Sequence, residues 1–288
     1  MHAAERSDRL MSSRDTASRT AGLSGGEIAD LSDGRLRRAL RTATQLGASG
    51  VVGLARRHGF HESVHFALRN VRHMIAHRIA LRWDRKYGVD TAGSIQLAAL
   101  SVKGPNRKFG NECICTSPKS FDFMMRCLPA DLQDYTFVDF GSGKSRTVLL
   151  ASRYNLGKII GVEFAKELVD CARSNIARFN GAWQNCRDLE IIEADATEFV
   201  VPDKPLVIFF YNPFAREVFD IVLQNIVASL TAKKRPCYII YGSSSHDAIG
   251  WAAPAILASG YFETMAAEPM PMFFDSVRTI RFAAFRSL

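Results

Sequence analysis

The stretch Val138-Asp139-Phe140-Gly141-Ser142-Gly143-Lys144-Ser145 decides the fold of this chain. It continues the apolar run Tyr135–Phe140, which has the composition of a β-strand, and it leads into the helical pattern Ser145–Tyr154. The two glycines permit a tight turn and let a ligand approach the backbone closely. The helix that follows presents free backbone N–H groups at its start. The stretch therefore predicts a strand, a glycine turn and a helix that together bind a nucleotide-like ligand.

Two better-known glycine motifs do not fit this stretch. A phosphate-binding P-loop requires a glycine at position 138, where this sequence has Val138, and its loop would be too short because strand residues continue to Phe140. The apolar strand Leu206–Tyr211 also ends without the Asp of a nucleoside triphosphatase. The dinucleotide pattern G-x-G-x-x-G requires a glycine where Arg146 stands.

Strand and helix patterns alternate after residue 134, and two further strand patterns close the chain. This order predicts an α/β domain with a doubly wound, mainly parallel sheet. The expected strands are Tyr135–Phe140, Lys158–Phe164, Leu189–Glu193, Leu206–Tyr211, Cys237–Tyr241, Tyr261–Ala266 and Val277–Phe285, and the expected helices between them are Ser145–Tyr154, Lys166–Phe179, Ala215–Leu230 and His246–Ala258.

Three acids follow three successive strands. Asp139 ends the first, Glu163 the second, and Asp195 comes directly after the third. Because the carboxyl ends of parallel strands meet at one edge of a sheet, these acids are expected to lie along the edge where open α/β sheets bind ligands.

Four motifs in this order resemble those of the class I, seven-stranded S-adenosylmethionine-dependent methyltransferases. The resemblance covers about residues 135–288 and implies a doubly wound, Rossmann-like sheet of seven strands with a terminal antiparallel strand. An N-terminal helical region would precede it. Ser145 replaces the third glycine of the loop, and the fourth motif has one Pro instead of two, which leaves the substrate class open. The motifs are Asp139-x-Gly141-x-Gly143, Gly161-Val162-Glu163, Ala194-Asp195-Ala196 and Asn212-Pro213-Phe214.

The resemblance implies a set of residues that bind the cofactor, S-adenosylmethionine. Glu163 would accept hydrogen bonds from the ribose hydroxyls, and Asp195 would accept one from the adenine amino group. Asp139 would orient the glycine loop and the amino group of the methionine part. Turn capping is the structural alternative for Asp139 and Asp195. The full expected set is Asp139, Gly141, Ser142, Gly143, Glu163, Phe164, Asp195 and Ala196.

The segment after the fourth strand is expected to act on the methyl acceptor. The runs Phe137–Gly143, Gly161–Glu163 and Ile208–Ala215 are locally similar to the non-SET histone-lysine methyltransferases, which implies a protein amine as one candidate substrate. The Asn212 side chain and the Pro213 carbonyl would hold that amine, and Phe214 would pack on it. The structural alternative is a Pro-terminated strand with a capping Asn.

His246 is the only histidine of the C-terminal two-thirds of the chain. It is a second candidate for the chemistry, as a general base. A role in a loop or a helix cap is the other interpretation of this residue.

The charge of the chain is concentrated at its N-terminus. Residues 1–87 hold 16 Lys and Arg against 8 Asp and Glu, which accounts for the whole net charge of +8. A basic segment can meet nucleic acid, a phospholipid surface or an acidic protein, or it can simply be a solvated face. The alternative function is therefore a non-catalytic binding module of the same fold, whose basic N-terminal region binds nucleic acid or an acidic partner.

The N-terminal part is expected to contain a disordered basic tail at 1–34 and a helical region at 35–130, before the methyltransferase domain at 131–288. Within it, His61–Trp83 has a helical pattern. Its apolar stripe, expected to be buried, is Val64, Leu68, Val71, Ile75 and Ile79.

Neither the histidines of that helix nor the six cysteines have the spacing of a complete metal site, so no metal is expected. No apolar run is long enough for a membrane span, and the first 20 residues lack the apolar core of a signal peptide. A cytoplasmic protein with reduced thiols is expected.

Overall fold

The structure, a computed structural model, describes residues 60–96, 100–101, 105–244, 246–271 and 280–288 of the 288. The chain divides into two compact units, Met1–Gly47 and Ala48–Leu288, and all described residues belong to the second. The tail predicted at 1–34 lies outside the described residues. The proposed boundaries at 34 and 130 stay predictions.

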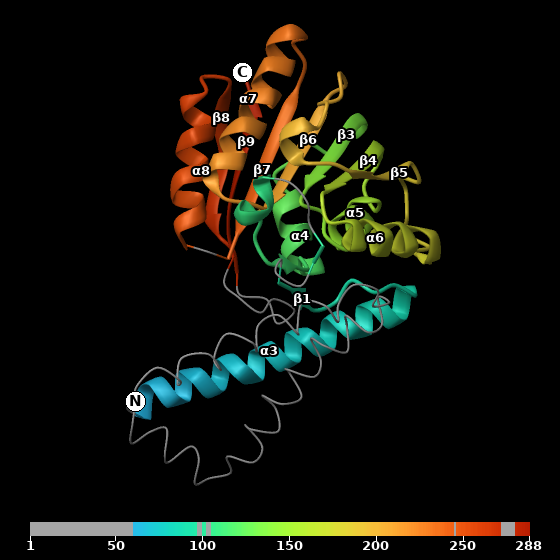
Figure 1. Cartoon of the computed structure of the whole chain (residues 1–288), viewed down its shortest axis with the longest axis vertical. Coiled ribbons are helices and arrows are strands. Elements are labelled where there is room, and N and C mark those ends of the chain that lie inside the picture. Colours follow the sequence, from blue (N-terminus) through green and yellow to red (C-terminus); the bar gives the residue numbers. More distant parts are fainter. Residues whose placement is uncertain (1–59, 97–99, 102–104, 245, 272–279) are drawn as a thin grey trace, which may run out of the picture. The chain divides into compact units, whose positions relative to one another are not determined.

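A seven-stranded sheet forms the body of the described unit (Figure 1). Its strand order is β5-β4-β3-β6-β7-β9-β8, so the chain starts in the middle, winds outward in one direction and then returns to wind outward in the other. All pairings from β5 to β7 are parallel, whereas β9 runs antiparallel to both β7 and β8. The strands are β3 (Leu132–Phe140), β4 (Leu156–Glu163), β5 (Leu189–Glu193), β6 (Leu206–Tyr211), β7 (Cys237–Ser243), β8 (Phe262–Pro269) and β9 (Arg281–Ser287).

Helices cover both faces of this sheet, which confirms the doubly wound α/β prediction. Successive residues of a strand point to opposite faces, so β6 sends Ile208 and Phe210 into one core and Val207 and Phe209 into the other. The first core is closed by α7 (Arg216–Ala232) and α8 (His246–Ala258). The second is closed by α4 (Pro118–Met125), α5 (Arg146–Ala151) and α6 (Lys166–Arg178).

The predicted elements agree with the observed ones to within a few residues at each end. The first strand is longer than expected, because Leu132 joins it and is buried in the second core. The last strand begins at Arg281 rather than at Val277, and residues 272–279 lie outside the described residues. A separate two-stranded sheet, β1 (Ser94–Ile95) with β2 (Cys113–Ile114), precedes the main one, followed directly by α4.

The long helix α3 (Phe60–Tyr87) exists as predicted, but the expected buried stripe is wrong at Val71 and Ile75, while the side chains of Val64 and Leu68 lie outside the described ones. Val71 is 47% exposed and Ile75 41% exposed. The buried face instead carries Ala76, Ala80 and Tyr87. Small residues allow the helix backbone to approach its neighbours, and a charged residue, Asp84, is buried among them because it has partners there.

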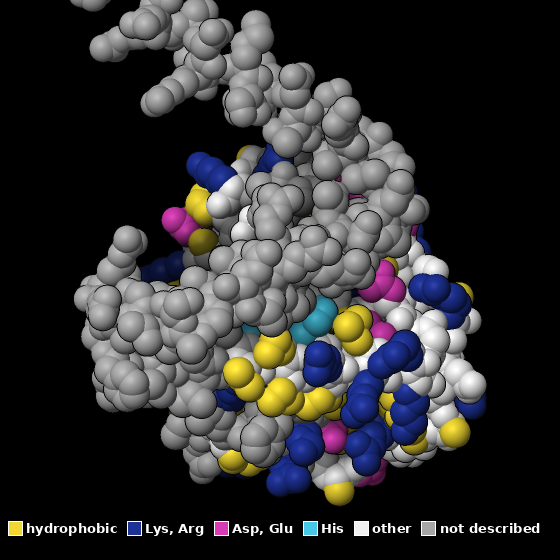
Figure 2. All heavy atoms as spheres, turned by 90° about the horizontal axis from the view of Figure 1, so that it is seen from below, with side chains coloured by type: hydrophobic (Ala, Val, Ile, Leu, Met, Phe, Trp, Pro, Cys, Tyr) yellow, Lys and Arg dark blue, Asp and Glu magenta, His cyan; other side chains and the backbone are white. Residues whose placement is uncertain are grey.

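The opposite face of α3 is basic as well as apolar. Arg78, Arg82, Arg85 and Lys86 are exposed beside the apolar side chains of that face, and among the described side chains of α3 the one acid is the buried Asp84. Figure 2 looks at the molecule from below and shows hydrophobic and basic side chains intermingled on that side. The side chains of 60–70, including His61 and His65, lie outside the described ones.

Candidate functional site

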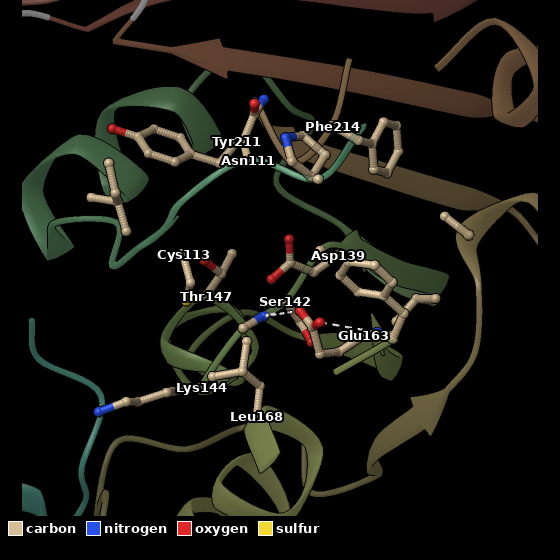
Figure 3. A pocket seen from close by; sticks show the side chains of 18 of the residues that line it. Asn111, Cys113, Asp139, Ser142, Lys144, Thr147, Glu163, Leu168, Tyr211 and Phe214 are labelled. Carbon is tan, nitrogen blue, oxygen red and sulfur yellow. Dashed lines mark hydrogen bonds between the residues drawn. The ribbon is translucent and has the colours of Figure 1, made fainter. Parts of the chain in front are cut away.

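A pocket lies at the carboxyl edge of the sheet, where the ends of β3, β4 and β6 meet (Figure 3). The edge was predicted from the acids that follow successive strands. The structure brings the predicted residues of the glycine loop together there with all three acids. Predicted residues that line the pocket are Asp139, Gly141, Ser142, Gly143, Glu163, Phe164, Asp195, Ala196, Pro213 and Phe214.

The glycine loop has the backbone geometry that its sequence predicts. Gly141 has φ of 73° and Gly143 has φ of 54°, both in the left-handed region that favours glycine. A Cβ on Gly141 would lie only 2.4 Å from the Cβ of Pro213, so a glycine is also required there by packing. The loop is fixed to the neighbouring strand because the N–H groups of Gly141 and Ser142 both donate to the Val162 carbonyl.

Ser145 stands where the related motif has its third glycine, and it also has a left-handed φ, of 70°. Its hydroxyl is buried without a hydrogen-bond partner.

We expect Ser145→Gly to raise the free energy of unfolding by about 1 kcal/mol, because relief of the left-handed strain exceeds the extra entropy of a glycine in the unfolded chain. Chemical denaturation monitored by circular dichroism would measure it. Gly143→Ala should instead lower the free energy of unfolding, because its Cβ would meet the Cys113 sulfur at 2.5 Å. A lower free energy of unfolding in Ser145→Gly would contradict the strain argument.

The two basic residues of the loop region point away from any phosphate position. Lys144 Nζ makes an ion pair with Asp90 at 2.8 Å, and Arg146 makes one with Asp84 at 2.7 Å. Burial alone would lower the pKa of Lys144, but Asp90 more than offsets this and the pKa is raised. A P-loop uses its lysine on the ligand phosphates, whereas Lys144 is committed to the protein, which supports the rejection of that motif.

Asp139 and Glu163 form a buried acidic pair at the base of the pocket. Asp139 is 2% exposed, and no hydrogen bond to its carboxylate is found within the described residues. Burial, with the nearby Glu163 second, raises the pKa of Asp139 well above its usual value. Burial also raises the pKa of Glu163, although three backbone N–H groups, of Gly143, Phe164 and Ala165, donate to this carboxylate and oppose the shift. A cationic ligand would stabilise both groups in their charged form.

Asp195 both caps a turn and lines the pocket. Its Oδ1 accepts from the backbone and hydroxyl of Thr197, at the start of the short helix η3 (Ala196–Glu198). Its Oδ2 accepts from the amide of Asn106 at 2.8 Å. The turn-capping alternative therefore describes one of its oxygens. The binding of an adenine amino group by the other stays a prediction.

The acceptor motif adopts a geometry that the sequence did not indicate. Asn212 has φ of 47° and is not among the residues that line the pocket, and its Oδ1 accepts from the Tyr241 hydroxyl at 3.3 Å. The Pro213 carbonyl accepts from the Asn111 N–H at 3.0 Å. Phe214 lines the pocket, but its ring is 7% exposed and packs on Phe210 in the first core. The roles of Asn212, Pro213 and Phe214 toward an acceptor stay predictions.

Several site residues lie upstream of the recognised motifs. Asn106, Asn111 and Cys113 line the pocket from the segment before α4, and Asp84 reaches the glycine-loop helix through Arg146. No periodicity or spacing marks these residues. The side chain of His246 lies outside the described ones.

The strand order, the glycine loop after the central strand β3 and the acid at the end of β4 agree with what the resemblance to the class I S-adenosylmethionine-dependent methyltransferases implies. Comparison with protein-family models finds no match, and no curated protein is similar in sequence.

Solved structures do resemble the chain at low identity. A precorrin-6y C5,15-methyltransferase from Geobacter metallireducens GS-15 has a TM-score of 0.45 and 18% identity, over 66% of this chain and 96% of that one. TrmN from Thermus thermophilus has a TM-score of 0.45 and 12% identity, over 60% of this chain and 49% of that one. A putative S-adenosylmethionine-dependent methyltransferase from Listeria monocytogenes has a TM-score of 0.43 and 10% identity, over 58% of this chain and 96% of that one.

Two further expectations concern metal binding and membrane spans. No group of three or more His, Cys, Asp or Glu side chains in the described part of the chain could hold a metal ion. Nor does any helix there combine the length and the apolar character that a membrane span needs.

Proposed function

We propose that this protein is a methyltransferase that uses S-adenosylmethionine and transfers the methyl group to an amine nitrogen. The observation that carries the proposal is the buried pair Asp139 and Glu163, which lies against the glycine loop at the carboxyl edge of a sheet with this strand order. S-adenosylmethionine supplies an electrophilic methyl group on a positively charged sulfur.

The residues of the pocket fit that cofactor. Ser142 Oγ is buried 2.8 Å from the position that a Cβ on Gly161 would take, so a residue without a side chain at 161 lets the glycine loop lie directly on β4. Glu163 lies within reach of a ribose that follows the loop, and the half-buried ring of Phe164 offers a face to a base. Asp139 compensates the positive charge of the methionine part.

An amine acceptor suits the charge of the pocket. Its lining includes the carboxylates of Glu112, Asp139, Glu163 and Asp195, whereas the two basic residues that line it, Lys144 and Arg146, are both held in ion pairs. The balance therefore favours cationic or hydrogen-donating ligands over phosphates. Tyr211 and the Asn212–Phe214 turn at the end of β6 would position the nitrogen, since methyl transfer depends mainly on orientation and the exclusion of water.

Calorimetry tests the cofactor. We expect S-adenosylmethionine to bind and Glu163→Gln to weaken it by roughly 1–3 kcal/mol, the cost of losing a charged hydrogen-bond acceptor. Glu193→Gln is the matched control, because Glu193 ends the neighbouring strand but is exposed and outside the pocket. Binding of Mg-ATP with no binding of S-adenosylmethionine would end the proposal.

If S-adenosylmethionine binds, incubation with the labelled cofactor and a cell extract would identify the acceptor class.

The exposed basic face of α3 supports the proposal of a polyanionic partner, such as RNA or an acidic protein. We expect binding of single-stranded RNA to fall steeply with salt, with a logarithmic slope of about −3 if four basic side chains each meet a phosphate. Arg78→Glu with Arg82→Glu should flatten that slope and leave the affinity for S-adenosylmethionine unchanged. A fluorescence-anisotropy titration at several salt concentrations measures both effects. Binding that persists at high salt would instead indicate an apolar contact through Val71 and Ile75.

That titration and the incubation with labelled cofactor and cell extract together separate the enzyme from the alternative, a non-catalytic binding module. RNA binding without methyl transfer to any component of the extract would favour the module.

A further inference from the structure

The segment 105–115, here called the strap, lies across the pocket. It contacts three parts of the site: Asp195, the Asn212–Phe214 turn and the glycine loop. It contains the short helix η2 (Pro105–Phe109) and the strand β2 (Cys113–Ile114). It precedes all the recognised motifs in the chain, and five of its residues after η2, from Gly110 to Ile114, line the pocket together with Asn106 and Cys115. Figure 3 shows Asn111 and Cys113 on the side of the pocket that faces Asp139 and Ser142.

The first contact is at the acid proposed to bind adenine. The Asn106 side-chain amide donates to Asp195 Oδ2 at 2.8 Å. An adenine amino group and a carboxamide NH₂ are both planar nitrogen donors, so Asn106 presents to Asp195 the same chemistry that the base would present. Both groups need the same oxygen, because Asp195 Oδ1 already accepts from Thr197.

The second contact is at the turn proposed to hold the acceptor amine. The Asn111 N–H donates to the Pro213 carbonyl, and the Asn111 side-chain amide donates to the Asn212 carbonyl, both at 3.0 Å. Gly110 forms a β-bridge with Phe214, and the Phe109 carbonyl accepts from the Ala215 N–H at 2.8 Å. The Pro213 carbonyl, one of the two groups expected to hold an amine, is thus engaged by a nitrogen donor of the chain itself.

The third contact is with the glycine loop. The Cys113 sulfur lies 2.5 Å from the position that a Cβ on Gly143 would take, so this side chain packs directly on the backbone of the loop. Burial raises the pKa of the Cys113 thiol to about 12, with Glu163 as the second cause. Cys113 is therefore a neutral packing group.

Besides these contacts, the strap is held by the pairing of β2 with β1 and by Phe109, which packs on the first core. None of the residues of η2 is buried, and Asn111 is exposed. A segment with few buried apolar contacts and solvent-accessible hydrogen bonds opens at low free-energy cost, in contrast to the strands beneath it.

We propose that Asn106 and Asn111 hold the strap closed over the free site and must be displaced when ligands bind, because Asn106 occupies the acid proposed to bind adenine and Asn111 occupies the Pro213 carbonyl proposed to hold an amine. This inference rests on the proposed function. Each displaced hydrogen bond lowers the affinity of any ligand that needs the same group, and a ligand with a matching nitrogen donor regains a hydrogen bond there.

The test uses the full chain and two ligands, S-adenosylmethionine and an analogue in which the adenine amino group is replaced by hydrogen. Asn106→Ala removes the competing donor. We expect it to tighten S-adenosylmethionine about three- to tenfold, the scale of one hydrogen bond, and to tighten the analogue by a similar factor, because both ligands must displace the Asn106 amide. Asn185→Ala is the matched control, because this exposed Asn donates its side-chain amide to the Arg153 carbonyl and lies outside the pocket.

Hydrogen exchange gives the second readout. Addition of S-adenosylmethionine should accelerate exchange in 105–115 while it protects the loop 141–145, and Asn111→Ala should accelerate exchange in the strap before any ligand is added. Weaker binding in Asn106→Ala, or protection of the strap by the ligand, would overturn this proposal while leaving the cofactor assignment intact. Absence of S-adenosylmethionine binding in both the wild type and Asn106→Ala would overturn the cofactor assignment, and with it this inference.

Discussion

Asp84→Ala is expected to lower the free energy of unfolding by about 3–5 kcal/mol, the largest stability effect we expect from one substitution in the described chain. Asp84 is 5% exposed and Arg146 is 3% exposed, and their ion pair measures 2.7 Å. Asp84 also accepts from the backbone N–H groups of Thr91 and Ala92. Its removal leaves a buried guanidinium charge and two backbone donors without their partner.

Denaturant unfolding would measure this loss, with Asp170→Ala as the control. Asp170 forms an exposed ion pair with Lys166, for which we expect no more than about 1 kcal/mol. Asp84→Leu combined with Arg146→Met should recover part of the loss, because it removes both charges. A small effect of Asp84→Ala alone would mean that water reaches Arg146 and that the pair is not buried in solution.

The second large effect is expected on turnover. Asn212→Gly should leave the affinity for S-adenosylmethionine within a few-fold and should lower the rate of methyl transfer by roughly 10²–10³, the scale for one positioned polar group in a transition state. Glycine is the informative replacement because Asn212 has a positive φ, so the backbone stays unstrained and only the side chain is lost. Single-turnover kinetics with an identified amine acceptor would measure it.

Tyr241→Phe is the control for that result. It removes the hydroxyl that donates to Asn212 Oδ1 and leaves the Asn side chain in place, so we expect transfer within about tenfold of the wild type. If Asn212→Gly turned over at the normal rate, the side chain would hold Tyr241 rather than the acceptor. A second base, with His246 as the first candidate, would then be the better account.

The sheet could be predicted from the sequence because its signals are local. Each central strand is an apolar run, and each glycine or acid of the site comes directly after such a run, so chain order alone places them at one edge. The positive φ of Gly141 and Gly143 follows for the same reason. Asp139 and Glu163, which we propose to bind the cofactor, are within this local pattern, and both lie in the pocket.

The buried face of α3 could not be predicted in this way. Periodicity assigns the most apolar stripe to the core, and Val71 and Ile75 belong to that stripe. The helix instead buries the face that contains Asp84, because Arg146, 62 residues later in the chain, supplies the partner that makes a buried carboxylate tolerable. Periodicity within one helix cannot reveal an ion pair with a distant element, so this buried face could not be found from the sequence.

The strap was missed for a related reason. Asn106 and Asn111 are single amide residues, which have no characteristic spacing. Two of their partners are backbone carbonyls, which any residue type provides. The Asn111 contacts with Asn212 and Pro213 span about a hundred residues and become visible only when the fold brings both segments to the end of β6.

The position of Arg146 over Trp83 makes tryptophan fluorescence a probe for the docking of α3. The guanidinium lies 4.8 Å from the indole ring, in a cluster where Trp83 also contacts Tyr87 and Phe179. During refolding, docking of α3 brings the Arg146 guanidinium over the indole of Trp83, so it would appear as a change in tryptophan emission. Because Arg146 directly follows the glycine loop, we expect affinity for S-adenosylmethionine to be acquired together with that change.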